Sequence, residues 1–113
     1  MSKKKRLLNR ADFVNVNRSG KRYHTRHFVA IAKQNGLSIT RLGITASRKA
    51  GNAVKRNRIK RLIREFFRLN SPRIPQGYDI VVAAKKDASY LDLWKVKEEL
   101  GEVFFKKELN CQS

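Results

Sequence analysis

The sequence has one cysteine and no long apolar run, and each of these shortages excludes a class of protein. A single cysteine, Cys111, cannot form a disulfide within the chain. A disulfide-stapled secreted fold is therefore excluded, and a reducing compartment such as the cytoplasm is expected. No apolar stretch approaches the roughly 20 residues that a transmembrane helix needs, so we expect no membrane partner.

Acidic residues are also scarce, with nine Asp and Glu against 27 Lys and Arg, and the formal net charge is +18 at pH 7. The excess lies in residues 1–73, which hold 21 basic residues and only Asp12 and Glu65 as acids. Residues 74–113 hold six basic and seven acidic residues. Such an excess destabilises a compact chain by self-repulsion unless a polyanion neutralises it. Nucleic acid is therefore the leading partner class, ahead of an anionic membrane surface, and it should contact the first two thirds of the chain.

Hydrophobic periodicity predicts an α+β fold, a two-layer sandwich in which helices cover a small sheet. We expect one RNA-binding domain over 1–113, with a basic tail at 1–8 and a C-terminal tail at 109–113. The first expected elements are a helix capped by Asn9 and ending near Ser19 and Gly20, and an antiparallel hairpin of strands 27–32 and 38–47. The remaining ones are a helix capped by Asn52 that runs to Leu69, a strand at 78–85 and a helix from about Asp92 to Glu108.

The helix expected after Gly51 has one apolar side and one dense cationic side. At about 100° per residue, the apolar arc contains Ile59, Leu62, Ile63, Phe66, Phe67 and Leu69, and the opposite arc contains Lys60, Arg61, Arg64 and Arg68 with Asn57. Three more cations lie in the first two turns, where the helix dipole makes each unfavourable by roughly 0.3–1 kcal/mol at low salt. The one local acid, Glu65, is expected to pair with Arg61. A helix that keeps these cations against its own folding preference is expected to bind phosphate.

The segment RLGITASRKAGNAVKRNRIKRLIREFFR, residues 41–68, closely resembles the signature of the bacterial ribonuclease P protein subunit. A weaker similarity covers nearly the whole chain. The resemblance implies a protein that binds a large catalytic RNA, and that RNA itself cleaves the 5′ leader from precursor tRNA with Mg²⁺. It follows that no protein side chain is catalytic and that the protein, expected to be a monomer on its own, holds no metal or cofactor. The resemblance also implies a left-handed βαβ crossover, against the usual right-handed preference.

The same resemblance assigns two RNA-binding surfaces. The basic helix is expected to lie against the catalytic RNA, through Arg48, Lys49, Lys55, Arg56, Asn57, Arg58, Lys60, Arg61, Arg64 and Arg68. A cleft between the first helix and the sheet is expected to hold the single-stranded leader, through Phe13, Asn17, Phe28, Arg41, Thr45, Ser47, Lys85 and Lys86. Asn17 stands where relatives often have an aromatic, which weakens base stacking there. For Phe13 the residues leave a core role open, as the packing partner of Leu8.

Two other function classes stay open from the residues. A structural ribosomal RNA-binding protein would show the same composition, although segment 41–68 argues against it. A protein-only nuclease needs clustered carboxylates for Mg²⁺ or a His pair for acid–base chemistry. Six of the nine acids follow residue 85, away from the basic helix, and His24 and His27 have no obvious third ligand for a zinc site.

Overall fold

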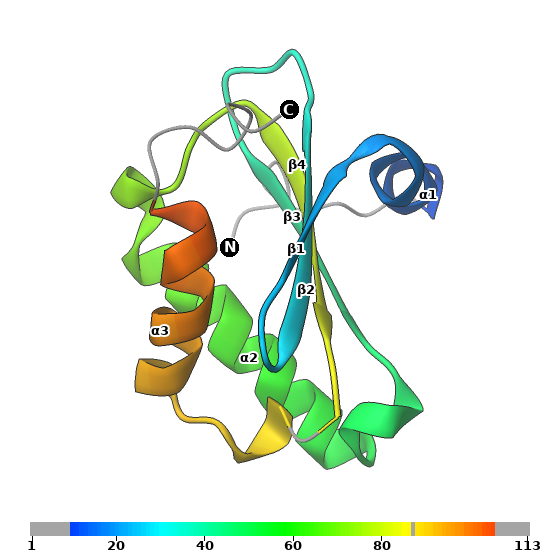
Figure 1. Ribbon diagram of the computed structural model, residues 1–113, viewed down its shortest axis with the longest axis vertical. Coiled ribbons are helices and arrows are strands. Elements are labelled where there is room, and N and C mark those ends of the chain that lie inside the picture. The colour runs from blue at the N-terminus through cyan, green and yellow to red at the C-terminus, as the bar shows by residue number, and fades with distance from the viewer. Residues whose placement is uncertain (1–9, 87, 106–113) are drawn as a thin grey trace.

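A computed structural model of the chain describes residues 10–86 and 88–105 (Figure 1). Within these ranges one four-stranded sheet separates α1 on one face from α2 and α3 on the other, so the predicted α+β class is confirmed. The helices are α1 (Arg10–Ser19), α2 (Ala53–Leu69) and α3 (Leu93–Phe104). The strands are β1 (Lys21–His24), β2 (Phe28–Gln34), β3 (Arg41–Ala46) and β4 (Tyr78–Ala84). Short 3₁₀ turns are η2 (Arg48–Ala50), η3 (Ser71–Arg73) and η4 (Ala88–Tyr90).

The strand order is β1-β2-β4-β3, and it differs from the predicted hairpin. Strand β4 lies between β2 and β3, antiparallel to β2 and parallel to β3. The predicted hairpin of 27–32 with 38–47 is therefore wrong, because the continuous apolar run of β4 takes the central place where both faces are buried. Helix α2 connects β3 to its parallel neighbour β4. The left hand of that connection, implied by the resemblance, stays a prediction.

The other neighbour of β2 is β1, a short edge strand that the periodicity did not predict. Its sequence is Lys-Arg-Tyr-His, whose charged side chains hide the strand signal. Lys21 lies opposite Ala32 and His24 opposite Val29 in an antiparallel register. Charged residues on an edge strand are common because they discourage pairing with another chain.

Side chains of successive strand residues point to opposite faces, and this alternation divides the apolar residues into two clusters. The larger cluster lies under α2 and α3 and includes Ile63, Phe66, Leu100 and Phe104, each completely buried. The smaller cluster lies under α1 and consists of Val16, Ile31 and Val81, with Phe13 and Val29 packed against it. The two faces of the sheet are therefore unequal, and α1 covers its face with few buried groups.

Local signals in the sequence account for the ends of the helices. Asn52 caps α2, since its side-chain oxygen accepts a hydrogen bond from the Lys55 backbone N–H at 3.0 Å, as predicted. Asp92 caps α3 in the same way, accepting from the Lys95 N–H at 2.9 Å. Leu69 was placed on the buried arc of α2, and this is wrong: as the last helical residue it is 53% exposed.

Several predicted features fall outside the described residues. They are the Asn9 cap, the Leu8 contact of Phe13, and the tails 1–8 and 109–113. The predicted end of the last helix at about Glu108 is wrong, because α3 ends at Phe104 and Phe105 is its C-terminal cap.

Candidate nucleic-acid interface

Helix α2 presents a row of cations, and the turn η2 before it adds two more. Arg56 and Lys60 are half-buried, whereas the other members of this row are exposed. We define the α2 cationic surface as Arg48, Lys49, Lys55, Arg56, Arg58, Lys60, Arg61 and Arg64. The apolar side of the helix packs on the sheet through Ile59, Ile63, Phe66 and Phe67. The predicted separation of apolar and cationic sides is thus present, apart from Leu69.

The acid on α2, Glu65, pairs with Arg68 rather than with Arg61. Arg68 lies one turn after Glu65 and donates to it from both Nε and NH2, with Nε 3.2 Å from Oε2. The hydrogen bond from Arg68 lowers the pKa of Glu65. The predicted Glu65–Arg61 pair is therefore wrong, and the charge of Arg68 is balanced within the helix. We leave Arg68 out of the α2 cationic surface for this reason.

The two arginines of the Arg-Asn-Arg core differ in their surroundings. Arg58 NH1 donates to the backbone oxygen of Leu91, just after η4, at 2.7 Å. Arg56 has a buried Nε without a hydrogen-bond partner among the described residues. Asn57, between them, is exposed. Asn57 therefore presents an exposed amide to a ribose or phosphate oxygen, whereas the Arg56 Nε is not reached from solvent.

Of the residues predicted for the leader cleft, Phe13 packs on the small apolar cluster under α1. Phe13 is half-buried over Val16 and Ile31, whereas Asn17, Thr45, Ser47 and Lys86 are exposed. Lys85 follows β4, and its Nζ donates to the backbone oxygen of Thr25 at 2.6 Å.

Phe28 is a correction to that set. It is completely buried in the cluster under α2 and α3, on the opposite face of the sheet from Phe13. It was assigned to the cleft by the resemblance, and the sequence of β2 could not correct that assignment because the strand is apolar on both faces. Phe28 is a core residue.

Arg41 lies at the edge of this face, and its charge is already balanced. Its Nε and NH2 donate to the two carboxylate oxygens of Asp79 at 2.8 and 2.6 Å, and its NH1 lies 3.9 Å from Asp12 Oδ2. Asp79 also accepts from Asn35 Nδ2 at 2.9 Å. Burial alone would raise the pKa of Asp79, but the hydrogen bonds from Arg41 and Asn35 outweigh it and lower that pKa.

This arrangement makes Arg41 a structural tie between α1, β3 and β4, and a phosphate would have to displace Asp79 to bind the guanidinium through Nε and NH2. Asp79 was not among the predicted residues. The signal for it was a lone acid inside the apolar run of β4, which needs a cation to stay charged when buried.

His27 and Glu99 form another close acid–base pair. Glu99 accepts from the His27 backbone N–H at 2.8 Å, and its second oxygen lies 2.6 Å from His27 Nδ1. Burial would raise the pKa of Glu99, but these hydrogen bonds lower it. The pair ties the start of β2 to α3. Within 10–86 and 88–105, no group of three His, Cys, Asp or Glu residues is placed to hold a metal ion.

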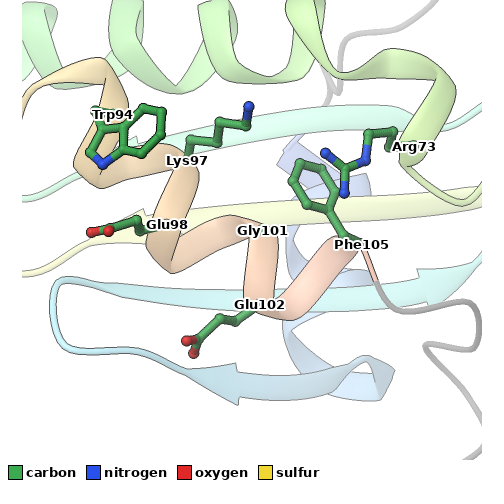
Figure 2. Close-up of a pocket in the computed structure, with 7 residues that line it drawn as sticks. All are labelled: Arg73, Trp94, Lys97, Glu98, Gly101, Glu102 and Phe105. Atoms are coloured by element: carbon green, nitrogen blue, oxygen red, sulfur yellow. The ribbon is translucent and has the colours of Figure 1, made fainter.

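A hollow of about 340 Å³ lies on the outer side of α3 (Figure 2). Arg73 and Lys97 bring positive charge to it, and Glu98 and Glu102 bring an equal negative charge. Arg73 lies over the ring of Phe105, 3.8 Å from its centre. With no net charge, this hollow does not resemble a site for a polyphosphate chain. None of the described helices is both long and apolar enough to cross a membrane.

Comparison with known proteins agrees with this geometry. The family model named Ribonuclease P matches residues 1–108. The chain is 44% identical over 110 residues to the ribonuclease P protein component of Syntrophus aciditrophicus (strain SB), covering 97% of this chain and 92% of that protein. It is 42% identical over 103 residues to the ribonuclease P protein component of Thermotoga maritima, covering 88% of each.

Solved structures share the fold. The RNase P protein from Thermotoga maritima matches with a TM-score of 0.83 and 40% identity, covering 91% of this chain and 97% of that one. A structure of the Staphylococcus aureus RNase P protein matches with a TM-score of 0.80 and 36% identity, covering 88% and 91%. The chain therefore belongs to the ribonuclease P protein family, and it is the protein component of this RNA-containing endoribonuclease.

Proposed function

We propose that the α2 cationic surface binds the catalytic RNA of ribonuclease P, and that the face under α1 binds the single-stranded 5′ leader of precursor tRNA. The RNA subunit then removes the leader with Mg²⁺, while the protein increases affinity for the substrate. In this proposal the protein is a cytoplasmic monomer, one domain over its whole length, until it meets the RNA.

The observation that carries the first half is the shortage of acids around α2. Glu65 is the one acid that α2 contains, and it is paired with Arg68. Of the remaining cations of the helix, Arg56 and Lys60 are half-buried and the others are exposed, and α2 contains no second carboxylate to pair with them. A helix that only needed to be soluble would gain about 0.2–0.5 kcal/mol from each opposite-charge pair at i and i+4. RNA phosphates are the counter-charge that this surface lacks.

The second half depends on the shape and chemistry of the α1 side. Phe13 offers a partly exposed ring for a base, and Thr45, Ser47 and Asn17 offer hydroxyl and amide groups to sugars and base edges. Lys85 and Lys86 bring positive charge to the end of β4. The set is small and has one available aromatic, so we expect modest affinity and little sequence preference for the leader.

The test of the proposed function is reconstitution with a bacterial ribonuclease P RNA and a precursor tRNA at low Mg²⁺. We expect the protein to bind the RNA and to increase affinity for the precursor. No binding and no change in cleavage would contradict the proposal and favour a ribosomal RNA-binding role. Cleavage of the precursor by the protein without the RNA subunit would instead indicate a protein-only nuclease.

The two faces are separated by comparing precursors with and without a leader. Lys86→Ala, at an exposed position, should weaken binding only of the precursor that carries a leader. Phe13→Ala should do the same, and its melting temperature must be measured because the ring also packs on Val16. An equal loss of affinity for both substrates would show that the leader does not bind at the α1 face.

A further inference from the structure

We propose that Tyr90 is a base-stacking residue, which binds one unpaired nucleobase of the catalytic RNA beside the α2 cationic surface. This inference rests on the proposed function, and it adds a contact that the basic residues cannot supply. Tyr90 belongs to η4, a turn that no motif in the sequence pointed to.

The turn η4 holds the Tyr90 ring outward, while its neighbours Ala88 and Leu91 are buried and hydrogen-bonded. Ala88 and Leu91, on either side of Tyr90, are 1% and 8% exposed, and the Leu91 N–H donates to the Ala88 oxygen at 3.2 Å. Arg58 NH1 binds the Leu91 oxygen at 2.7 Å, which ties the turn to α2. Tyr90 itself is 75% exposed. An aromatic ring held this far out of the core gains little from folding and is available to a ligand.

A cation accompanies the ring. Lys55 Nζ lies 5.4 Å from the centre of the Tyr90 ring, within the range of a cation–π contact. The nearby acid Asp92 is the N-cap of α3, and its carboxylate accepts a hydrogen bond from the Lys95 N–H at 2.9 Å. A ring for a base beside an ammonium for its phosphate is the combination that single-stranded nucleic acids use.

Trp94 provides an internal comparison, because it is also a highly exposed aromatic, at 65%, with a lysine near its ring. Lys97 Nζ lies 5.9 Å from the ring centre. Trp94, however, borders the hollow in which Glu98 and Glu102 cancel the positive charge (Figure 2). A polyanion is attracted to Tyr90 and not to Trp94, since only Tyr90 adjoins the acid-poor surface.

The position of η4 selects the RNA that Tyr90 meets. The turn packs on α2, whereas α1 and Phe13 lie across the sheet (Figure 1). The base that stacks on Tyr90 therefore belongs to the RNA docked on α2, the catalytic subunit.

The first experiment measures the affinity of Tyr90→Ala, Tyr90→Phe and Trp94→Ala for the catalytic RNA, each as the full chain. Loss of one stacked base should weaken binding about fivefold or more. Tyr90→Phe should stay within about twofold of wild type, because the ring remains. The slope of log affinity against log salt should be unchanged in Tyr90→Ala and should fall by about 0.7–0.9 in Lys55→Ala. Trp94→Ala should bind as wild type.

The second experiment uses fluorescence. Tyr90→Trp in a Trp94→Phe background places the single indole at η4, and stacking on a base should quench its emission when the catalytic RNA is added. Precursor tRNA alone should quench it much less. Equal affinities of wild type and Tyr90→Ala, or no quenching by bound RNA, would overturn this inference while leaving the proposed function intact. If wild type does not bind the RNA, the proposed function fails and this inference fails with it.

Discussion

Arg41 and the arginines of α2 differ in the acids that surround them. Arg41, at the edge of the sheet, meets Asp79 through two hydrogen bonds and lies 3.9 Å from Asp12. Arg61 and Arg64, on α2, have no acid of their own helix as a partner, since Glu65 binds Arg68. The side chain is the same in both places, and its role is set by the carboxylates around it.

This difference separates folding from binding. A guanidinium whose donors are used by a buried carboxylate contributes to stability and has little left for a ligand. A guanidinium that is exposed among other cations opposes folding and remains available to bind an external anion. The leader cleft and the α2 cationic surface should therefore not be treated as equally basic, even though both were predicted from basic residues.

The largest effect is expected from removing the carboxylate that holds Arg41. Asp79→Asn should lower the free energy of unfolding by about 1–3 kcal/mol, because it leaves a half-buried guanidinium without its counter-charge. Urea unfolding measures the change. Glu98→Gln, which removes an exposed acid 3.5 Å from Lys95 Nζ, is the control and should change stability by less than about 1 kcal/mol. Equal small effects would mean that the Arg41 pair is not structural.

Low pH should weaken two ion pairs, Arg41–Asp79 and His27–Glu99. The folded pKa values of Asp79 and Glu99 are both lowered, so their contribution to stability is complete above the unfolded values of about 3.9 and 4.3. That contribution is lost as the pH falls through the lower folded values, at about 1.4 kcal/mol per unit of lowering. Urea unfolding between pH 6 and pH 3 should show the loss in wild type and less of it in Asp79→Asn with Glu99→Gln. A parallel pH profile in that double variant would contradict the assignment.

The α2 side should respond in RNA affinity and not in stability. Arg64→Gln is expected to weaken binding of the catalytic RNA by about 1 kcal/mol and to reduce the salt slope by about 0.7–0.9. Arg73→Gln is the matched control, since Arg73 lies over Phe105 in the hollow without net charge. If both variants show the same salt slope as wild type, α2 is not the RNA-binding surface.

The smallest effect is also the most specific test, because one variant should change stability and RNA affinity in opposite directions. Lys55 is the third residue of α2, three after the Asn52 cap, where a glutamate would complete a capping box and favour the helix dipole. Lys55→Glu should raise the free energy of unfolding by about 0.3–1 kcal/mol while weakening RNA binding. Lys55→Gln should fall between. A variant that loses stability would show that the cations of α2 do not oppose folding.

Much of the fold followed from local patterns. The three helices, the cap of α2 and the central strand β4 were predicted because periodicity, capping residues and a continuous apolar run are properties of neighbours in the sequence. Strand pairing was not predicted correctly. Whether β3 pairs with β2 or with β4 depends on contacts between residues far apart in the chain, and β1 has too few apolar residues to show itself.

The site divides in the same way. Lys60, Arg61 and Arg64 of the α2 cationic surface were predicted because helical geometry converts spacing directly into a shared face, and its other members came from the resemblance. Phe28 was misplaced because a strand buried on both sides gives no sign of which face each residue takes. The neutralisation of Arg41 by Asp79, 38 residues away, and the support of Tyr90 by Arg58 were not visible at all.

The sequence by itself determined the excess of positive charge, the side of the basic helix that carries it and the family. These depend on composition and on spacing within one helix, which no later packing can change. Only the tertiary structure decided which cations keep a free charge, which aromatic rings reach solvent and which strands are neighbours. The reason is physical: a charge is balanced and a ring is covered by whatever lies within a few ångströms, and folding brings those groups from distant parts of the chain.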